Sequence, residues 1–206
     1  MKPRKPNIVY WLGNNLYVNV TNRCPNNCYF CFRNFTHILK GFDLQLRQEP
    51  SPEEVIIELQ KNINRKNWDE IVFCGFGEPL ERLDCIIKVT QWIKKYHGKT
   101  VRIDTNGQGF LLNKDRAVVE ELKETGVDRI SVSLNAHDTT TYTQICRPTF
   151  EDAYKSIWEF IEKSSKEFDL EVTAVTVPEV DLSKMREIAK EIGVKFRLRR
   201  LISCFW

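Results

Sequence analysis

Three cysteines stand close together near the start of the chain, at Cys24, Cys28 and Cys31, with the spacing C-x3-C-x2-C. Thiolate sulfur is a soft ligand that suits iron–sulfur clusters, and three thiolates on one short loop can hold three corners of a cubane cluster. A bacterial-type ferredoxin adds a further cysteine soon afterwards, but the next cysteine here, Cys74, is far along the chain. The spacing therefore predicts a [4Fe-4S] cluster with one open corner.

A zinc site is the main alternative for the same cysteines. Zinc would need a fourth ligand, which His37, six residues beyond Cys31, could supply. The chain would then be a non-catalytic zinc-binding module, or an iron–sulfur electron-transfer module if it held iron. In either case the odd total of seven cysteines indicates reduced thiols that serve a metal, not a disulfide framework.

The rest of the chain predicts strands that alternate with helices. Apolar patterning predicts six strands, over 16–21, 70–74, 100–105, 129–134, 170–177 and 195–202, with a hairpin strand over 8–11 before them. Capping and periodicity predict five helices, one starting at Ser51 and the others over 81–96, 114–125, 151–164 and 182–192. Such alternation implies right-handed crossovers and a parallel sheet.

The length limits how that sheet can close. The 206 residues contain no repeat and no linker, so a single domain over 1–206 is expected. A complete eight-unit barrel takes about 250 residues, which leaves a six-stranded partial barrel or an open doubly wound sheet. Residues that alternate with the aliphatic ones along the strands are unusually polar, and a polar inward face favours the partial barrel.

Glycine, carboxylate, hydroxyl and amide residues follow the predicted strands. Gly75, Gly77 and Glu78 follow the second one; glycine allows a close backbone approach to a ligand, and a carboxylate can accept hydrogen bonds from an ammonium group. Side chains that both donate and accept hydrogen bonds end the third and fourth strands at Thr105, Asn106, Ser133 and Asn135. Because α/β active sites form where parallel strands end, these residues should meet the cysteine loop.

Together these motifs resemble those of the radical S-adenosylmethionine (SAM) superfamily, and the resemblance covers nearly the whole chain. It implies a partial (β/α)6 TIM-like barrel in which the three cysteines bind a [4Fe-4S] cluster and SAM chelates the open iron. By the same resemblance the backbone around Phe30 contacts the adenine, and Glu78 with Gly75 and Gly77 holds the SAM amino group. The SAM carboxylate and ribose would be held by Thr105, Asn106, Ser133 and Asn135.

The resemblance also implies a reaction. In this family the reduced cluster delivers one electron to SAM, which splits into methionine and a 5′-deoxyadenosyl radical, and the radical abstracts hydrogen from a substrate. A reductant such as flavodoxin or ferredoxin is then the expected partner. The segments 73–80 and 133–136 are most similar to radical SAM proteins associated with TatD-type nucleases, while carboxy-deazaguanine synthases and activases of glycyl-radical enzymes are similar in size.

Five polar residues are candidates for substrate binding. Those on the inward faces of the strands are Asn19, Arg102, Arg197 and Arg199. Arg147 resembles an arginine that follows the fourth strand in several branches of the family. Paired guanidinium groups recognise planar anions, so a locally cationic lumen and a small anionic substrate are expected, with a partner protein as the other substrate class.

Overall composition excludes some partners. The chain has 31 Lys and Arg against 28 Asp and Glu, a net charge of +3, so nucleic-acid binding is not expected. No run reaches the ~18 apolar residues of a membrane span, and the first apolar stretch is too short for a signal peptide. A cytoplasmic protein is expected. Of the remaining cysteines, Cys204 follows the last strand, near the expected mouth of the barrel.

Overall fold

The computed structural model describes residues 6–201 and contains one main sheet of seven strands, in the order β1-β2-β5-β6-β7-β8-β9. The strands are β1 (Val9–Leu12), β2 (Asn15–Val18), β5 (Glu70–Phe73), β6 (Val101–Thr105), β7 (Arg129–Ser133), β8 (Asp169–Val175) and β9 (Lys195–Arg199). Within this sheet only the β1–β2 pairing is antiparallel. The six parallel strands and the preceding hairpin strand expected from the sequence are therefore confirmed.

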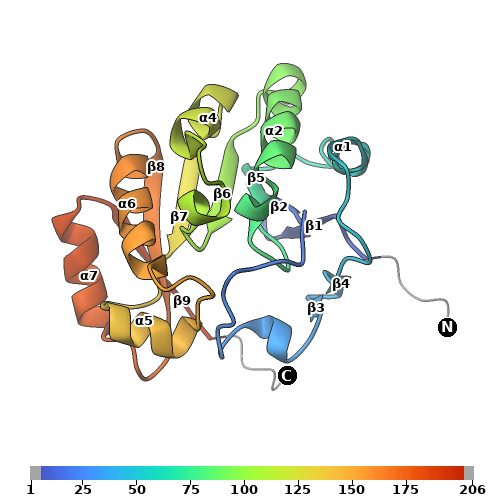
Figure 1. Ribbon diagram of the computed structural model, residues 1–206. Coiled ribbons are helices and arrows are strands. Elements are labelled where there is room, and N and C mark those ends of the chain that lie inside the picture. The colour runs from blue at the N-terminus through green and yellow to red at the C-terminus, as the bar shows by residue number, and fades with distance from the viewer. Residues whose placement is uncertain (1–5, 202–206) are drawn as a thin grey trace.

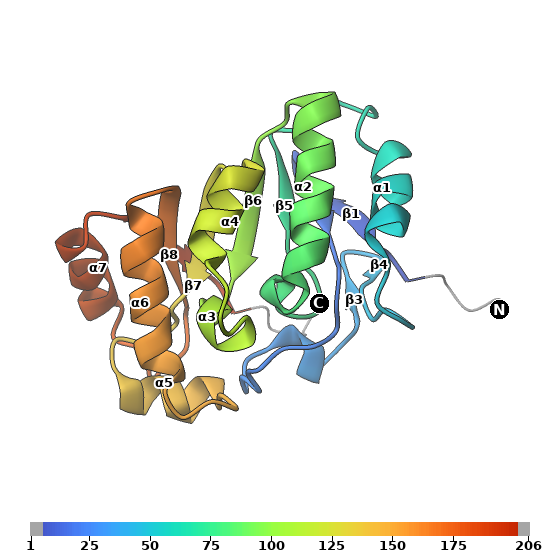
Figure 2. The same cartoon turned by 45° about the horizontal axis from the view of Figure 1, so that its top comes forward.

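Helices cover one face of this sheet (Figure 1). The five helices expected from the sequence are α1 (Pro52–Gln60), α2 (Leu83–His97), α4 (Val118–Thr125), α6 (Ala153–Ser165) and α7 (Leu182–Glu191). Figure 2 shows α7, α6, α4, α2 and α1 side by side along the sheet. Because β1 and β9 stand at opposite ends of the strand order, the sheet is not closed, and the fold is the expected partial (β/α)6 barrel.

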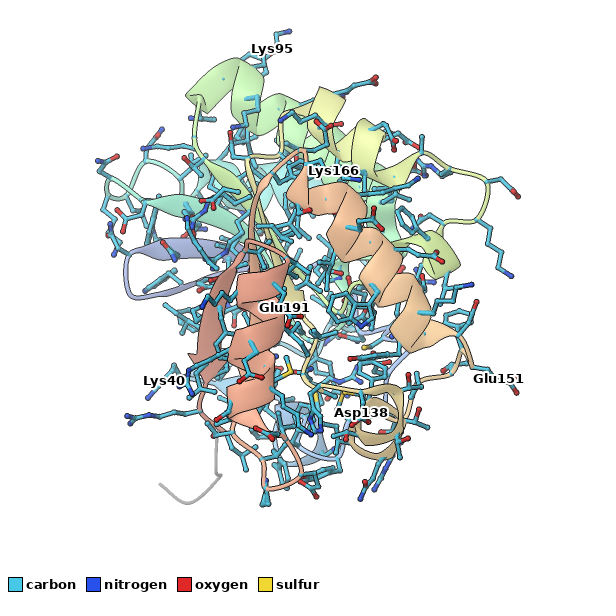
Figure 3. The ribbon with its side chains drawn as sticks, turned by 90° about the vertical axis from the view of Figure 1, so that its left-hand side faces the viewer. Lys40, Lys95, Asp138, Glu151, Lys166 and Glu191 are labelled. Atoms are coloured by element: carbon cyan, nitrogen blue, oxygen red, sulfur yellow. The ribbon has the colours of Figure 1, made fainter. Side chains whose placement is uncertain are left out.

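The two ends of this barrel can be followed in Figure 3. Asp138 and Glu151 lie at the end where the parallel strands finish, whereas Lys95 and Lys166, at or just beyond the C-terminal ends of α2 and α6, lie at the opposite end. Within residues 6–201 no helix combines the length and the apolar character needed to cross a bilayer.

Period-two alternation gives the sheet an apolar outer face. Buried aliphatic and aromatic side chains pack there against the helices, and those on the first four parallel strands include Leu16, Val18, Ile71, Phe73, Val101, Ile103, Ile130 and Val132. Leu198 alternates with inward-facing arginines and was also expected to be buried under the helices, but it is 38% exposed. This residue lies on the edge strand β9, where the sheet has no further neighbour and the helical cover ends.

Several short elements were not predicted. They are the hairpin of β3 (Ile38–Leu39) and β4 (Phe42–Asp43), the helices α3 (Gly109–Leu112) and α5 (Thr139–Cys146), and the 3-10 turns η1 (Phe32–Asn34) and η2 (Pro79–Arg82). Three consecutive β-branched threonines open α5, which lowers its intrinsic helix propensity. The cap of α5, where Asp138 Oδ1 accepts from Thr141 N at 2.7 Å, offsets part of that cost.

The Asn19 amide fastens the end of β2 to three other segments. Its Nδ2 donates to Leu44 O at 2.8 Å and to Asn7 O at 3.3 Å, and its Oδ1 accepts from Phe76 N at 3.0 Å. The side chain is fully buried. Asn19 was expected to contact the substrate, but its hydrogen-bonding atoms are occupied by the chain's own backbone, so its role is structural.

Replacing this amide should destabilise the fold. We expect Asn19→Ala to lower the free energy of unfolding by about 3 kcal/mol, because a buried carbonyl and a buried N–H lose their partners. Urea unfolding measures the change. The exposed Asn64, in the loop after α1, provides the control, since Asn64→Ala should change the same quantity by less than about 0.5 kcal/mol. Equal effects of the two substitutions would contradict the assigned role.

Candidate active site

The cysteine loop leaves β2 and is held by the distant end of α5. Asn27 N donates to Cys146 O at 3.0 Å and Tyr29 N to Ile145 O at 3.1 Å. Inside the loop, Asn34 Nδ2 donates to Cys28 O at 2.9 Å. The loop between the cysteines is therefore fixed by backbone contacts to a helix more than a hundred residues later.

The three loop cysteines are free, half-buried thiols. Burial raises the pKa of Cys24 to about 12, with a further contribution from the negative charge of Glu78. The pKa of Cys28 is lowered, chiefly by a hydrogen bond with Cys146. Since metal-bound sulfur is deprotonated, formation of a metal centre here must release protons.

The donor set fits a [4Fe-4S] cluster better than a single ion. Zinc takes four ligands at about 2.0–2.3 Å from one point. Among residues 6–201 no three Cys, His, Asp or Glu side chains are placed to hold one such ion. The His37 Nδ1 lies 2.8 Å from Asp43 Oδ1, and in the described part of the chain His37 does not join the cysteines in such a group. Three thiols without a fourth partner match a cluster that keeps one iron open for another ligand.

The glycines after β5 allow this segment to pack against the entrance of the cysteine loop. A Cβ on Gly77 would lie 2.3 Å from Arg23 O, and one on Gly75 would lie 2.1 Å from Asn19 Oδ1. The backbone also pairs here, because Gly77 N donates to Thr21 O at 2.9 Å. The close approach that these glycines permit is thus to the chain itself, and their assignment to SAM stays a prediction.

Glu78 connects the segment after β5 to the end of β6. Its buried carboxylate accepts from Thr105 Oγ1 and from Asn106 N, both at 2.7 Å, and from Leu80 N at 3.1 Å. Burial raises the pKa of Glu78 to about 7. Asn106 continues the connection, because its Nδ2 lies 3.8 Å from Cys24 Sγ. The structure therefore brings the cysteine loop, Glu78 and the end of β6 together, as the strand order implied.

A buried polar group next to Asn106 was not anticipated. Gln108 Nε2 donates to Asn26 Oδ1 at 2.7 Å and to Tyr142 Oη at 3.1 Å, and Asn26 Nδ2 donates to Tyr142 Oη at 2.8 Å. These contacts connect the cysteine loop, the start of α3 and the helix α5. Asn26 lies between the first two cysteines, so this group adjoins the cysteine loop.

The remaining candidates for SAM contacts lie at the same end of the barrel. Asn135, just after β7, is buried with φ +62°, and Ser133 is half-buried at the end of β7. Phe30 is half-buried, with its ring 5.5 Å from that of Tyr29. Arg147 has an exposed side chain and φ +48°, and its carbonyl accepts from Asn27 N at 3.2 Å.

Comparison with known proteins gives the family. The model of the radical SAM superfamily matches residues 18–192, most of the chain. This protein belongs to the radical SAM superfamily. The cofactors of that family are a [4Fe-4S] cluster and SAM, and its members are enzymes. The more detailed resemblance to the TatD-associated subfamily stays a prediction.

Curated relatives of this radical SAM chain include GTP 3',8-cyclases. The probable GTP 3',8-cyclase of Methanocaldococcus jannaschii is 27% identical over 188 residues, which cover 91% of this chain and 58% of that protein. The GTP 3',8-cyclase of Limosilactobacillus fermentum is 30% identical over 131 residues, or 63% of this chain and 36% of that protein. The chain spans a little over half the length of the first of these relatives.

Solved structures share the fold. SuiB of Streptococcus suis, bound to SAM, superposes with a TM-score of 0.66 at 16% identity, covering 92% of this chain and 40% of SuiB. Methylornithine synthase superposes with a TM-score of 0.62 at 17% identity, covering 91% of this chain and 53% of that chain. The partial barrel seen here is the fold of these radical SAM enzymes.

The lumen of the radical SAM barrel is not cationic as expected. Arg102 Nη1 lies 3.0 Å from Glu70 Oε2, and Arg197 Nη2 lies 2.7 Å from Glu171 Oε1. Arg129 also pairs with Glu70 at the strand beginnings. Because these carboxylates share the inward face with the arginines, they neutralise them, and the predicted local excess of positive charge is wrong.

Arg199 differs from the other inward arginines. Its Nη2 donates to Asn135 Oδ1 at 2.9 Å, so this guanidinium reaches one of the predicted SAM residues. Burial lowers its pKa. Cys204 lies outside the described residues.

The raised pKa of Glu78 predicts a pH-dependent stability. A carboxyl group whose pKa rises from 4.5 to about 7 on folding stabilises the fold fully below about pH 4.5 and loses that contribution as the pH rises to about 7. Glu78→Gln removes this titration. We therefore expect the free energy of unfolding of the variant, relative to the unmodified cluster-free chain, to rise by roughly 2 kcal/mol between about pH 5 and pH 8.

Urea unfolding at a series of pH values measures this difference. Glu124→Gln, at an exposed position on α4, is the matched control and should show a constant difference. A constant difference for Glu78→Gln as well would contradict the raised pKa.

Proposed function

We propose that this chain is a radical SAM enzyme that reductively cleaves SAM at a [4Fe-4S] cluster held by Cys24, Cys28 and Cys31. The observation that carries the proposal is the contact between motifs: Glu78 accepts from Asn106, and Asn106 reaches the sulfur of Cys24. When bound, the cluster supplies the electron that splits SAM into methionine and a 5′-deoxyadenosyl radical. The protein binds and orients SAM so that this radical meets a substrate hydrogen.

Individual residues would hold individual groups of SAM. The Glu78 carboxylate is buried next to the cysteine loop and would accept hydrogen bonds from the SAM ammonium group, which would stabilise its ionised form. Thr105 and the Asn106 backbone hold that carboxylate in place. Asn106, Ser133 and Asn135 would contact the carboxylate and ribose, and the backbone around Phe30 with Gly75 and Gly77 would complete the site.

Guanine nucleotides are the substrate class that we propose. Support comes from the relatives named GTP 3',8-cyclase, which align with about nine-tenths of this chain in the case of the Methanocaldococcus protein. A nucleotide is a small anion, in keeping with the substrate class expected from the sequence. The negative charge of such a nucleotide would have to be balanced by groups other than Arg102 and Arg197, because these two arginines are already paired with glutamates.

Partners and location follow from the proposed chemistry. Radical SAM enzymes need an electron donor, and we propose flavodoxin or ferredoxin. We also propose that residues 1–206 form one radical SAM core domain, and that the protein is cytoplasmic. A partner protein at the open side of the barrel, between β1 and β9, is the alternative to a small substrate.

Loss of one cysteine ligand should abolish the cofactor. Anaerobic reconstitution with iron and sulfide should give about four iron atoms per chain and a brown protein, and dithionite should then produce 5′-deoxyadenosine and methionine from SAM. We expect Cys28→Ala to lose both the colour and this cleavage. Cys85→Ala, at a buried thiol on α2, should keep both. Cleavage by Cys28→Ala would refute the ligand assignment, and one tight zinc without colour would support the zinc module.

Glu78→Ala should separate SAM binding from cluster binding. We expect this variant to retain iron but to bind SAM more weakly by about 1.5–3 kcal/mol, the range for a hydrogen bond to a charged group. Equilibrium dialysis of the iron-loaded, gel-filtered protein measures the affinity. Glu124→Ala serves as the exposed control. Unchanged affinity in Glu78→Ala would leave the segment after β5 as a structural turn only.

A further inference from the structure

Cys146, the last residue of α5, places a fully buried thiol against the cysteine loop. A hydrogen bond joins this thiol to that of Cys28. Both residues are free cysteines, and the proposed reaction uses only Cys28. Two thiols in contact can form a disulfide when their backbones lie at a suitable separation.

A short antiparallel pairing sets these two cysteines opposite each other. Asn26 and Pro148 form its bridge, and two residues from that bridge, forward along one segment and backward along the other, stand Cys28 and Cys146. Residues at opposite positions of an antiparallel pair lie about 4.5–5.5 Å apart between their Cα atoms. A disulfide takes Cα separations of about 4.4–6.8 Å, so this register suits one.

Two backbone hydrogen bonds hold the register on either side of Cys28. Asn27 N donates to Cys146 O at 3.0 Å, and Tyr29 N donates to Ile145 O at 3.1 Å. Because these bonds already fix the two backbones, joining the two sulfur atoms requires movement of the side chains and not of the chain segments.

The two thiols differ in their access to solvent. Cys28 is half-buried on the loop, whereas Cys146 has no exposed surface. A small oxidant can therefore reach Cys28 first, and Cys146 can react only with a neighbour inside the protein. Thiol–disulfide exchange proceeds through a mixed disulfide that a second thiol resolves, and these two positions suit the two steps.

We propose that Cys28 and Cys146 form a reversible disulfide in the cluster-free chain, with a small disulfide such as oxidised glutathione as the oxidant. The Cys28 sulfur attacks the oxidant, which releases one small thiol and leaves a mixed disulfide on Cys28. The Cys146 sulfur then attacks the Cys28 sulfur and releases the second small thiol. Two protein thiols are thereby oxidised, their two protons pass to the released thiols, and one small disulfide is reduced.

The disulfide has a consequence for the cluster, and this consequence rests on the function proposed above. The sulfur of Cys28 cannot bind iron while it is bonded to Cys146, because the thiolate is the metal ligand. A reductant must then open the disulfide before the cluster is loaded. In the same way, a loaded cluster protects Cys28 from the exchange.

Peptide mapping of the cluster-free full chain tests the disulfide directly. The chain is treated with oxidised glutathione, its remaining thiols are blocked with N-ethylmaleimide, and it is digested with trypsin without reductant. We expect the peptides 24–33 and 130–155 to appear joined through Cys28, and dithiothreitol to separate them. This product should exceed any other disulfide at least about tenfold, because the two thiols are held in contact.

Two variants identify the partners. Cys146→Ser should lose the joined peptides and keep glutathione on peptide 24–33, since the resolving thiol is absent. Cys85→Ser, at a buried thiol on α2, is the matched control and should give the same joined peptides as the unmodified chain. Far-UV circular dichroism checks that both variants are folded.

Three results would overturn the inference. The first is a disulfide from Cys28 to Cys24 or Cys31 in place of Cys146, the second is a stable glutathione adduct as the end product of the unmodified chain, and the third is identical products from Cys146→Ser and the unmodified chain.

The same map of the cluster-loaded chain tests the proposed function separately. Loading should reduce the joined peptides at least about tenfold, because iron occupies the Cys28 sulfur. Equal amounts from loaded and cluster-free chains would support the disulfide and contradict the assignment of Cys28 to the cluster.

Discussion

The buried carboxylate of Glu78 is the contact on which the arrangement of the site depends. It follows one strand of the sheet and accepts hydrogen bonds from the end of the next strand, so it fixes β5 and β6 relative to each other where both finish. Three donors surround it, and this is the condition under which a carboxyl group can be held in an interior at all. The sheet already pairs β5 with β6, and this contact adds a fixed position for the turn after β5 against the residues at the end of β6.

Packing between backbones is the second constraint. Gly77 lies so close to Arg23 that no side chain fits between them, and the peptide groups on both sides pair. The cysteine loop therefore begins at a defined distance from Glu78. The Glu78 carboxylate and Gly77 thus hold together three segments that are far apart in sequence: the start of the cysteine loop, the turn after β5 and the end of β6. Each segment therefore contributes only a few residues to the site.

Local chemistry explains which features could be predicted from the sequence. The capping box at Ser51 is realised as hydrogen bonds in both directions, and the apolar side of each parallel strand except the edge strand β9 is buried as its period implies. The charge of the lumen was mispredicted because Glu70 and Glu171 were left out, although the period that turns Thr173 inward turns Glu171 inward too. Gln108 and Tyr142 could not be foreseen to meet Asn26, because only the tertiary structure brings them together.

The contacts between the cysteine loop and α5 have a consequence for biosynthesis. Asn26 binds a tyrosine 116 positions later, and the loop backbone pairs with residues just beyond that tyrosine. On the ribosome the thiols emerge when the chain segment that shapes their loop has not yet been made, and contacts of such long sequence separation form late. The loop that carries the three thiols therefore reaches its final shape only after α5 has been made and has folded against it.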